Sequence, residues 1–252
     1  MKKFPISETF DSIQGEGIYT GTRMFFIRFA GCSVGKKLPK EFYDDTPREI
    51  KDQNAPGGYR IERSKLPIYT EQCHTYDGRS FNCDTDFRTK EVLTGEELID
   101  RIPKGVEHVC LTGGEPLNQP LAEFIDFLSD LGFMVHIETS GTVSFTDKYP
   151  NYSEQDSLSN PDGGWLWLTV SPKMGVLEEM IGIADEIKLL VDDHFDVAKI
   201  PEDILDHKLV WIQPINAEFS VDRKNLDKCI QLLKEHPSWR LSTQMHKIWN
   251  VR

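Results

Sequence analysis

The stretch His108-Val-Cys-Leu-Thr-Gly-Gly-Glu115 decides the fold, because a short apolar strand passes directly into a polar, glycine-rich turn. Three further runs of strand-forming residues end in the same way, at residues 138–141, 171–173 and 213–214. In a parallel α/β barrel the carboxyl ends of the strands meet at one mouth, where substrates bind. Four polar clusters after four strands therefore predict one shared site.

Strands and helices alternate along most of the chain, which indicates parallel βα units. We expect helices over residues 120–131, after Ser220, and from a capping box of Thr94 and Glu97. Residues 33–72 interrupt this order with many charged and turn-forming residues. The sequence thus predicts one α/β domain over residues 1–252 with an insertion at about residues 33–72. Strands are expected over residues 24–30, 108–112, 133–139, 165–170, 186–191, 209–213 and 239–243.

The composition limits the possible partners. The chain has 252 residues, with 29 Lys and Arg against 41 Asp and Glu, which gives a formal net charge of −12. Such a chain lacks the basic face that nucleic acids and anionic membranes require. No run reaches the roughly 18 apolar residues of a membrane span, and no apolar secretory signal follows the first lysines. We therefore expect a cytoplasmic enzyme with no nucleic-acid or membrane partner.

The cysteines point to metal chemistry. In a cytosolic protein, an odd and irregularly spaced set of five cysteines favours metal binding or catalysis over disulfides. Cys32, Cys73 and Cys83 flank the insertion and would suit three irons of a 4Fe–4S cluster, with the fourth iron open. A structural zinc site with His74 as fourth ligand is equally compatible with the spacing. Cys110 lies within a strand and is expected to be a buried thiol.

The sequence around these cysteines carries a resemblance. Over nearly the whole chain, except residues 33–72 and a loop near residue 151, it resembles the 7-carboxy-7-deazaguanine synthase family. These are radical S-adenosylmethionine (SAM) enzymes of the queuosine, or 7-deazapurine, pathway. The matching motifs are Phe10-Asp-Ser-Ile-Gln-Gly-Glu-Gly17, Phe26-Ile-Arg-Phe-Ala-Gly-Cys32, Cys83-Asp-Thr85, Leu111-Thr-Gly-Gly-Glu-Pro116, Ile137-Glu-Thr-Ser-Gly141, Val170-Ser-Pro-Lys173, Gln213-Pro-Ile215 and Gln244-Met-His-Lys247.

Another short radical SAM enzyme, such as a glycyl-radical activase, is the alternative reading, because it shares the three-cysteine loop and Gly-Gly-Glu. Arg28, Thr85 and residues 244–247 favour the synthase. A zinc-stabilised binding protein is the alternative outside enzymes.

The resemblance implies a partial or modified (β/α) TIM-type barrel of the radical SAM class. It implies a carbon–nitrogen lyase that converts 6-carboxy-5,6,7,8-tetrahydropterin to 7-carboxy-7-deazaguanine with loss of ammonia. Its cofactors would be a 4Fe–4S cluster, SAM and Mg²⁺. The implied partners are the pterin substrate, an electron donor such as a flavodoxin or ferredoxin, and a second copy of the chain in a homodimer.

The resemblance also assigns roles by position. Cys32, Cys73 and Cys83 would bind the cluster that cleaves SAM, and the Thr85 hydroxyl would bind Mg²⁺, which prefers oxygen ligands. Substrate-binding residues would be Ile13, Gln14, Gly15, Glu16, Arg28, Thr112 and Arg252. SAM-binding residues would be Asn82, Cys83, Asp84, Gly113, Gly114, Glu115, Ser171, Pro172, Lys173, Gln213, Pro214, Ile215 and Asn216.

The cluster loop departs from the family pattern. The usual Cys-x3-Cys-x2-Cys spacing would place a cysteine at position 36, where this chain has Lys36. The middle cysteine is therefore expected at Cys73, beyond the insertion, with Cys110 as the competitor. A long insertion between ligands is tolerable because the entropy cost of closing a loop grows slowly with its length.

Overall fold

We describe the fold from a computed structural model of the chain. The structure describes residues 2–37, 48–51, 59–62, 71–83, 85–150, 152–160, 164–216 and 220–251. Two of the expected site residues, Asp84 and Arg252, lie outside this part of the chain, as does most of the insertion. The backbone of Asn82 is described, but its side chain is not.

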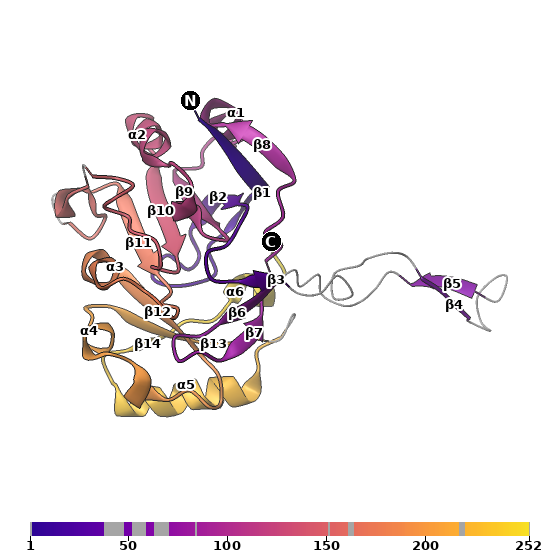
Figure 1. Ribbon diagram of the computed structural model, residues 1–252, viewed down its shortest axis with the longest axis vertical. Helices are drawn as coiled ribbons and strands as arrows, with labels where there is room; N and C mark the ends of the chain where they lie inside the picture. Colours follow the sequence, from indigo (N-terminus) through magenta and orange to yellow (C-terminus); the bar gives the residue numbers. More distant parts are fainter. Residues whose placement is uncertain are drawn as a thin grey trace.

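A nine-stranded mixed sheet forms the centre of the molecule, in the order β14-β13-β12-β11-β10-β9-β2-β1-β8 (Figure 1). The strands from β2 through β9 to β14 run parallel, whereas β1 is antiparallel to both β2 and β8. The bounds are β1 (Lys3–Ile13), β2 (Arg23–Phe29), β8 (Glu91–Thr94), β9 (His108–Gly113), β10 (Met134–Thr139), β11 (Leu166–Val170), β12 (Glu186–Val191), β13 (Val210–Pro214) and β14 (Arg240–Leu241).

All seven expected strands are confirmed within a few residues, as β2 and β9 to β14. The expected barrel is confirmed only as a mixed α/β fold with a large parallel sheet. The sheet begins at β14 and ends at β8, and these two edges do not pair within the described residues, so the barrel is not closed.

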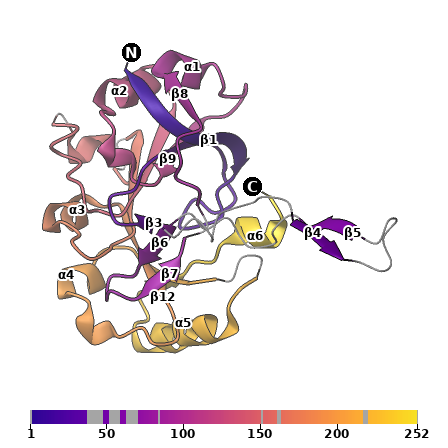
Figure 2. The ribbon, with the colours of Figure 1, turned by 45° about the vertical axis from the view of Figure 1, so that its right-hand side comes forward.

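Among the described residues, helices lie on both sides of the curved sheet, and only the last of them is on the cavity side (Figure 2). They are α1 (Gly95–Ile99), α2 (Ala122–Asp130), α3 (Glu178–Ile183), α4 (Glu202–Leu205), α5 (Arg223–Glu235) and α6 (Met245–Trp249), with 3-10 turns η2 (Pro116–Asn118), η3 (Glu154–Asp156) and η4 (Val197–Lys199). The three expected helices are α2, α5 and α1. The capping box of α1 is present, because Thr94 N–H donates to Glu97 Oε2 at 2.7 Å and Glu97 N–H donates to Thr94 Oγ1 at 3.2 Å.

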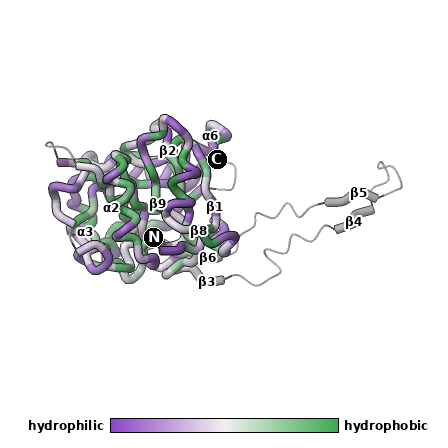
Figure 3. Tube along the Cα trace, turned by 90° about the horizontal axis from the view of Figure 1, so that it is seen from above, coloured by the Kyte–Doolittle hydropathy of each residue, from purple (hydrophilic) through white to green (hydrophobic). Residues whose placement is uncertain are grey.

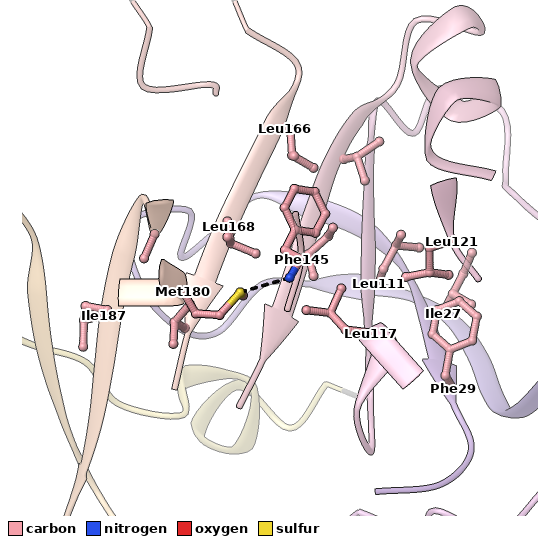
Figure 4. Close-up of a cluster of buried hydrophobic side chains, with 14 of the residues drawn as sticks. Ile27, Phe29, Leu111, Leu117, Leu121, Phe145, Leu166, Leu168, Met180 and Ile187 are labelled. Atoms are coloured by element: carbon pink, nitrogen blue, oxygen red, sulfur yellow. Dashed lines mark hydrogen bonds between the residues drawn. The ribbon is translucent and has the colours of Figure 1, made fainter. Parts of the chain in front are cut away.

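Side chains of a strand point alternately to its two faces, and this pleat separates the core from the site. Odd-numbered residues such as Ile27, Leu111 and Ile137 pack in one cluster with Leu98 of α1 and Phe124 of α2. Figure 4 shows part of this cluster, where Phe145 N–H lies 3.2 Å from Met180 Sδ. In β2, β9, β10 and β12 the even-numbered residues face the opposite, concave side, whereas in β11 and β13 the odd-numbered residues Thr169 and Gln213 do so. Apolar residues concentrate in the interior of the body (Figure 3).

The insertion begins and ends in a small second sheet. β3 (Lys36–Lys37) pairs with β6 (Glu71–His74), and β6 pairs with β7 (Ser80–Asn82). Lys37 lies opposite Glu71, so the chain leaves and returns at neighbouring positions. Figure 2 shows β6, β7 and α6 on the same side of the main sheet. Within the insertion, β4 (Arg48–Lys51) pairs with β5 (Tyr59–Glu62).

Candidate active site

A cavity of about 410 Å³ lies on the concave face, at the carboxyl ends of the parallel strands. The four polar clusters expected after strands all contribute to it. Thr112 and Gly113 come from β9, Glu138 comes from β10, Ser171 follows β11, and Gln213 comes from β13. The parallel direction of these strands explains why clusters far apart in sequence share one opening.

Three of the five cysteines line this cavity, and they come from three separate segments. Cys32 follows the turn after β2, Cys73 lies in β6, and Cys83 comes directly after β7. All three are partly exposed and form no disulfide. Cys110 does not line the cavity; it is buried beside Met24 and Phe26, where burial raises the pKa of its thiol. The geometry thus groups Cys73, and not Cys110, with Cys32 and Cys83.

A buried lysine accompanies these thiols. Lys173 is only 6 % exposed, and its Nζ donates to Ser171 Oγ at 3.0 Å. Burial lowers the pKa of Lys173, while the negative charge of Cys73, Cys83 and Cys32 opposes that shift. A buried ammonium requires compensating negative charge. Three cysteine sulfurs and one buried lysine around a single cavity therefore fit an anionic, thiolate-bound group.

The zinc alternative lacks its fourth ligand at this cavity. His74 does not line the cavity, and its Nδ1 lies 3.2 Å from the Thr75 carbonyl oxygen. Within the described residues, no three His, Cys, Asp or Glu side chains are close enough to hold one metal ion. A cubane iron–sulfur cluster is larger than a single ion, so its cysteine ligands need not converge on one point.

Two glycines let the β2 and β9 loops touch. Gly114 N–H donates to the Phe29 carbonyl at 3.1 Å, and Glu115 N–H donates to the Gly31 carbonyl at 2.9 Å. A Cβ atom on Gly114 would lie 1.6 Å from the Gly31 carbonyl oxygen, so no larger residue fits without movement of the backbone. This close contact fixes the loop that carries Cys32 beside the glycine turn.

Glu115 stabilises the same turn on the side away from the cavity. It is fully buried, and its carboxylate accepts hydrogen bonds from Leu117 N–H at 3.1 Å, Thr139 Oγ1 at 2.7 Å and Ser140 N–H at 2.9 Å. It does not line the cavity. Glu115 thus links the loops after β9 and β10 through hydrogen bonds.

The floor of the cavity is polar and centres on Glu138. Its two carboxylate oxygens accept hydrogen bonds from Gln14 Nε2 and from Thr112 Oγ1, both at 3.0 Å. These donors come from the loop after β1 and from the end of β9. Three elements therefore fix this carboxylate in one orientation.

Arg28 lies on the wall formed by β1 and β2. Its Nε lies 2.9 Å from Glu8 Oε1, and its Nη1 donates to Thr85 Oγ1 at 3.2 Å. The guanidinium also lies 5.5 Å from the centre of the Phe10 ring. Contacts on several sides hold the guanidinium in place, and it connects β1 to the Thr85 segment that follows Cys83.

A buried ion pair joins Glu16 to Lys188. Lys188 Nζ donates to Glu16 Oε2, and the side chains are 9 % and 13 % exposed. Burial alone would raise the pKa of Glu16. The charge and hydrogen bond of Lys188, helped by His246 and Gln244, outweigh burial and lower that pKa to about 2. Glu16 is therefore a carboxylate throughout the physiological range.

The segment at α6 closes one side of the cavity. Met245 N–H donates to the Gly15 carbonyl at 3.0 Å, and Asn216 Nδ2 donates to Gln244 Oε1 at 3.3 Å. His246 and Lys247 line the cavity. A Cβ atom on Gly15 would lie 2.4 Å from His246 Nδ1, which explains the need for glycine at this contact.

Most of the residues expected at the site lie around this one cavity. Of those described, Glu115 and Pro172 are buried and do not line it. The sequence placed Glu138 in one of the predicted polar clusters but gave it no role, and it missed Lys188, whose only signal is a charged residue inside an apolar strand run. The expected residues that line the cavity are Ile13, Gln14, Gly15, Glu16, Arg28, Cys32, Cys73, Cys83, Thr85, Thr112, Gly113, Gly114, Ser171, Lys173, Gln213, Pro214, Ile215 and Asn216.

Comparisons with known proteins identify relatives of this chain. No family model matches the chain. The chain is 32% identical over 259 residues to 7-carboxy-7-deazaguanine synthase of Buchnera aphidicola, with 99% of each chain covered. It is 28% identical over 260 residues to the enzyme of that name from Escherichia coli, again with 99% of each covered. A crystal structure of QueE from Escherichia coli matches with a TM-score of 0.61 and 26% identity, over 96% of this chain and 94% of that one.

Proposed function

The chain belongs to the 7-carboxy-7-deazaguanine synthase family, and from this premise we propose that it is a radical SAM lyase of queuosine biosynthesis. Its substrate is 6-carboxy-5,6,7,8-tetrahydropterin, and its products are 7-carboxy-7-deazaguanine and ammonia. One observation carries the proposal: Cys32, Cys73 and Cys83 line the same cavity as the glycine turn at Gly113 and the polar floor at Glu138.

Cys32, Cys73 and Cys83 would bind three irons of a 4Fe–4S cluster. Among the described residues, the other two cysteines, Cys110 and Cys229, are buried in the core, so one iron is left for SAM. When bound, the cluster and SAM supply the one-electron chemistry that removes a hydrogen atom from the substrate. Lys173 is placed to offset the negative charge of the thiolates.

The SAM-binding role falls to the strand ends beside the cysteines. Gly113 and Gly114 would offer backbone groups to the methionine part of SAM, since glycine permits close approach. Glu115 and Pro172 would act by shaping the loops. The remaining residues proposed for SAM are Asn82, Cys83, Asp84, Ser171, Lys173, Gln213, Pro214, Ile215 and Asn216.

The substrate would lie over the floor of the cavity. Arg28 would pair with the pterin carboxylate, because a guanidinium matches a carboxylate with two parallel hydrogen bonds. The Thr85 hydroxyl, already 3.2 Å from Arg28 Nη1, would bind a Mg²⁺ ion that also contacts that carboxylate. Ile13, Gln14, Gly15, Glu16 and Thr112 would contact the pterin ring, with Arg252 as a further substrate contact.

The wider organisation follows from the same family membership. The open sheet would be the partial barrel of radical SAM enzymes, in one domain over residues 1–252 with an insertion at about residues 33–72. The functional form would be a cytoplasmic homodimer that receives electrons from a flavodoxin or ferredoxin. No helix among the described residues is long and apolar enough to cross a bilayer.

Turnover by the reconstituted protein tests the proposal. The chain is reconstituted anaerobically with iron and sulfide, reduced, and incubated with SAM, Mg²⁺ and 6-carboxytetrahydropterin. Mass-resolved chromatography should show 7-carboxy-7-deazaguanine while most SAM is conserved. Release of 5′-deoxyadenosine without the deazaguanine would contradict the proposed substrate. One zinc per chain, without iron or sulfide in anaerobically purified protein, would contradict the radical mechanism itself.

A further inference from the structure

Lys188 is a buried cation in the cavity with no role so far. It lies in β12 and faces the concave side, where its side chain is 9 % exposed. Removing an ammonium from water is costly unless nearby anions compensate. The groups around Lys188 therefore indicate what its charge does.

Carboxylates from three directions surround Lys188. Glu16 from the loop after β1 pairs with it directly, and Glu138 on β10 and Glu186 on β12 add negative charge. These charges outweigh burial and raise the pKa of Lys188, so it is an ammonium. The three carboxylates give this end of the cavity several hydrogen-bond acceptors.

The three carboxylates differ in what they can still bind. Glu186 lies deeper, where it accepts from Thr169 Oγ1 at 2.8 Å and from Ile18 N–H at 3.2 Å, and burial raises its pKa. Glu138 accepts from Gln14 and Thr112. Glu16 lines the cavity, and each of its oxygens has more than one lone pair to offer. Glu16 is thus the carboxylate best placed to meet a ligand.

We propose that Lys188 is a positioning residue for substrate recognition, which holds Glu16 ionised and aimed into the cavity to accept hydrogen bonds from the amino-pyrimidine edge of the pterin. This inference rests on the proposed function, because the proposed pterin substrate carries that row of N–H donors. A site built around an acceptor rejects an analogue that lacks the matching donor, since its own polar group is then left unpaired.

The role of Lys188 has a distinctive dependence on pH. Besides Lys188, the titratable groups that act on Glu16 include His246 from α6. Glu138, Glu186 and Lys173 face the same lysine. Without Lys188, burial is the largest influence left, and the pKa of Glu16 rises. Ligand binding should then weaken as the pH falls, whereas the natural protein keeps an ionised Glu16.

Binding measurements without turnover test the inference. Calorimetric titrations of the reconstituted full chain compare two ligands at pH 7.0 and 5.5, without SAM or reductant. The ligands are 6-carboxypterin and 6-carboxylumazine, in which an oxo group replaces the amino group. The unmodified chain should prefer the pterin and bind it about equally at both pH values. Lys188→Met should weaken pterin binding by about ten- to a hundredfold, reduce the preference, and lose further affinity at pH 5.5.

Three variants separate this role from a purely structural one. Lys188→Arg keeps the charge and should restore most of the affinity and the flat pH profile. Glu16→Gln should lose the preference for the amino group at either pH. The double variant, Glu16→Gln with Lys188→Met, leaves neither member of the ion pair and should bind like Glu16→Gln alone. If Lys188→Met unfolds, this pair still tests whether Lys188 acts only through Glu16; weaker binding by the double variant would contradict the inference.

The outcomes distinguish the inference from the proposed function. If the unmodified chain prefers 6-carboxypterin while Lys188→Met binds it equally well with the same preference and pH profile, the inference is wrong and the proposed function stands. If the unmodified chain binds neither compound, the proposed substrate is wrong, and the inference fails with it.

Discussion

At the scale of single residues, Gly114 shows how one missing side chain positions the site. Its backbone lies so close to Gly31 that a Cβ atom would overlap the carbonyl oxygen. We expect Gly114→Ala to lower the free energy of unfolding by about 2 to 4 kcal/mol, because backbone must move. Denaturant titration measures this loss. Gly182→Ala in α3 is the control, since its Cβ would meet no atom within 4 Å, and it should be neutral or stabilising. Equal losses in both variants would contradict the argument.

The choice between Cys73 and Cys110 is also made at this scale. We expect Cys73→Ala to lose the iron–sulfur absorbance after reconstitution, because this thiol lines the cavity with Cys32 and Cys83. Cys110→Ala should retain it, because Cys110 is buried beside Met24 and Phe26. Iron and sulfide analysis accompanies the spectra. Loss of the absorbance in the Cys110 variant together with its survival in the Cys73 variant would reverse the assignment.

At the scale of elements, the β6–β7 hairpin takes the place of a short cluster loop. Because β3 pairs with β6, the long insertion does not separate the segments that carry Cys32 and Cys73. The hairpin turn is fastened to the main sheet, because Arg79 Nη2 lies 2.7 Å from Asp192 Oδ1, just beyond β12, and 2.9 Å from Asp77 Oδ2. The position of two cysteines therefore depends on a bridge outside the cavity.

This bridge gives a prediction for Arg79→Gln. Loss of the ion pairs should free the hairpin, so that alkylation of Cys73 and Cys83 in the cluster-free protein becomes about three- to tenfold faster. Global stability should also fall, by about 3 kcal/mol, because Arg79→Gln leaves the fully buried Asp77 carboxylate without its cation. Peptide-resolved mass spectrometry measures alkylation, and iron per chain should fall after reconstitution.

The matched control is Arg23→Gln, which removes an arginine–aspartate pair with Asp11 at the other end of β2. Alkylation rates of the two cysteines should not change in this variant. The hairpin bridge is refuted if Arg79→Gln and Arg23→Gln give the same rates and the same iron content.

Elements with strong local patterns could be predicted from the sequence, and those defined by tertiary pairing could not. The parallel strands carry dense apolar residues, and α2 and α5 show helical spacing. β1 is different: its polar residues Glu8 and Asp11 alternate with buried ones, and it reads as a strand only once β2 pairs with it. The short strands β3, β6 and β7 lack a core of their own. Their register, which sets the position of Cys73, depends on contacts distant in sequence.

The same limit explains which site residues were missed. The strands read as continuous apolar runs covered on both faces, because Met24, Phe26 and Cys110 fill part of the concave face. Further along the strands that face turns polar, with Glu138 and Lys188. A charged residue inside a strand of a parallel sheet is a usable signal. Applied beyond Arg28, it would have identified Lys188 and given Glu138, already in a predicted polar cluster, a role of its own.

At the scale of the whole molecule, the two faces of the sheet perform different tasks. The helix-covered face provides the large apolar core, while the concave face holds ionisable groups whose protonation depends on burial. At the end of the concave face away from the cysteines, His108 Nδ1 and His136 Nε2 lie 2.8 Å apart, with the Tyr19 ring edge-on to His136. Such a pair shares one hydrogen bond only while at least one ring is neutral.

Stability should consequently fall in mild acid. Burial, with a smaller contribution from His108, lowers the pKa of His136 to about 3, and burial also lowers that of His108. The unfolded chain then binds more protons than the folded chain between the ordinary histidine pKa and about 3, so stability decreases as the pH falls through that window. For His136 the loss between pH 7 and 5 is about 2 kcal/mol. Denaturant titrations at several pH values should show this loss of stability.

His136→Gln should flatten the pH dependence of stability, whereas His194→Gln, which replaces a side chain that is 80% exposed, should leave it unchanged. An undiminished acid slope in His136→Gln would mean that this pair does not limit the stability of the fold.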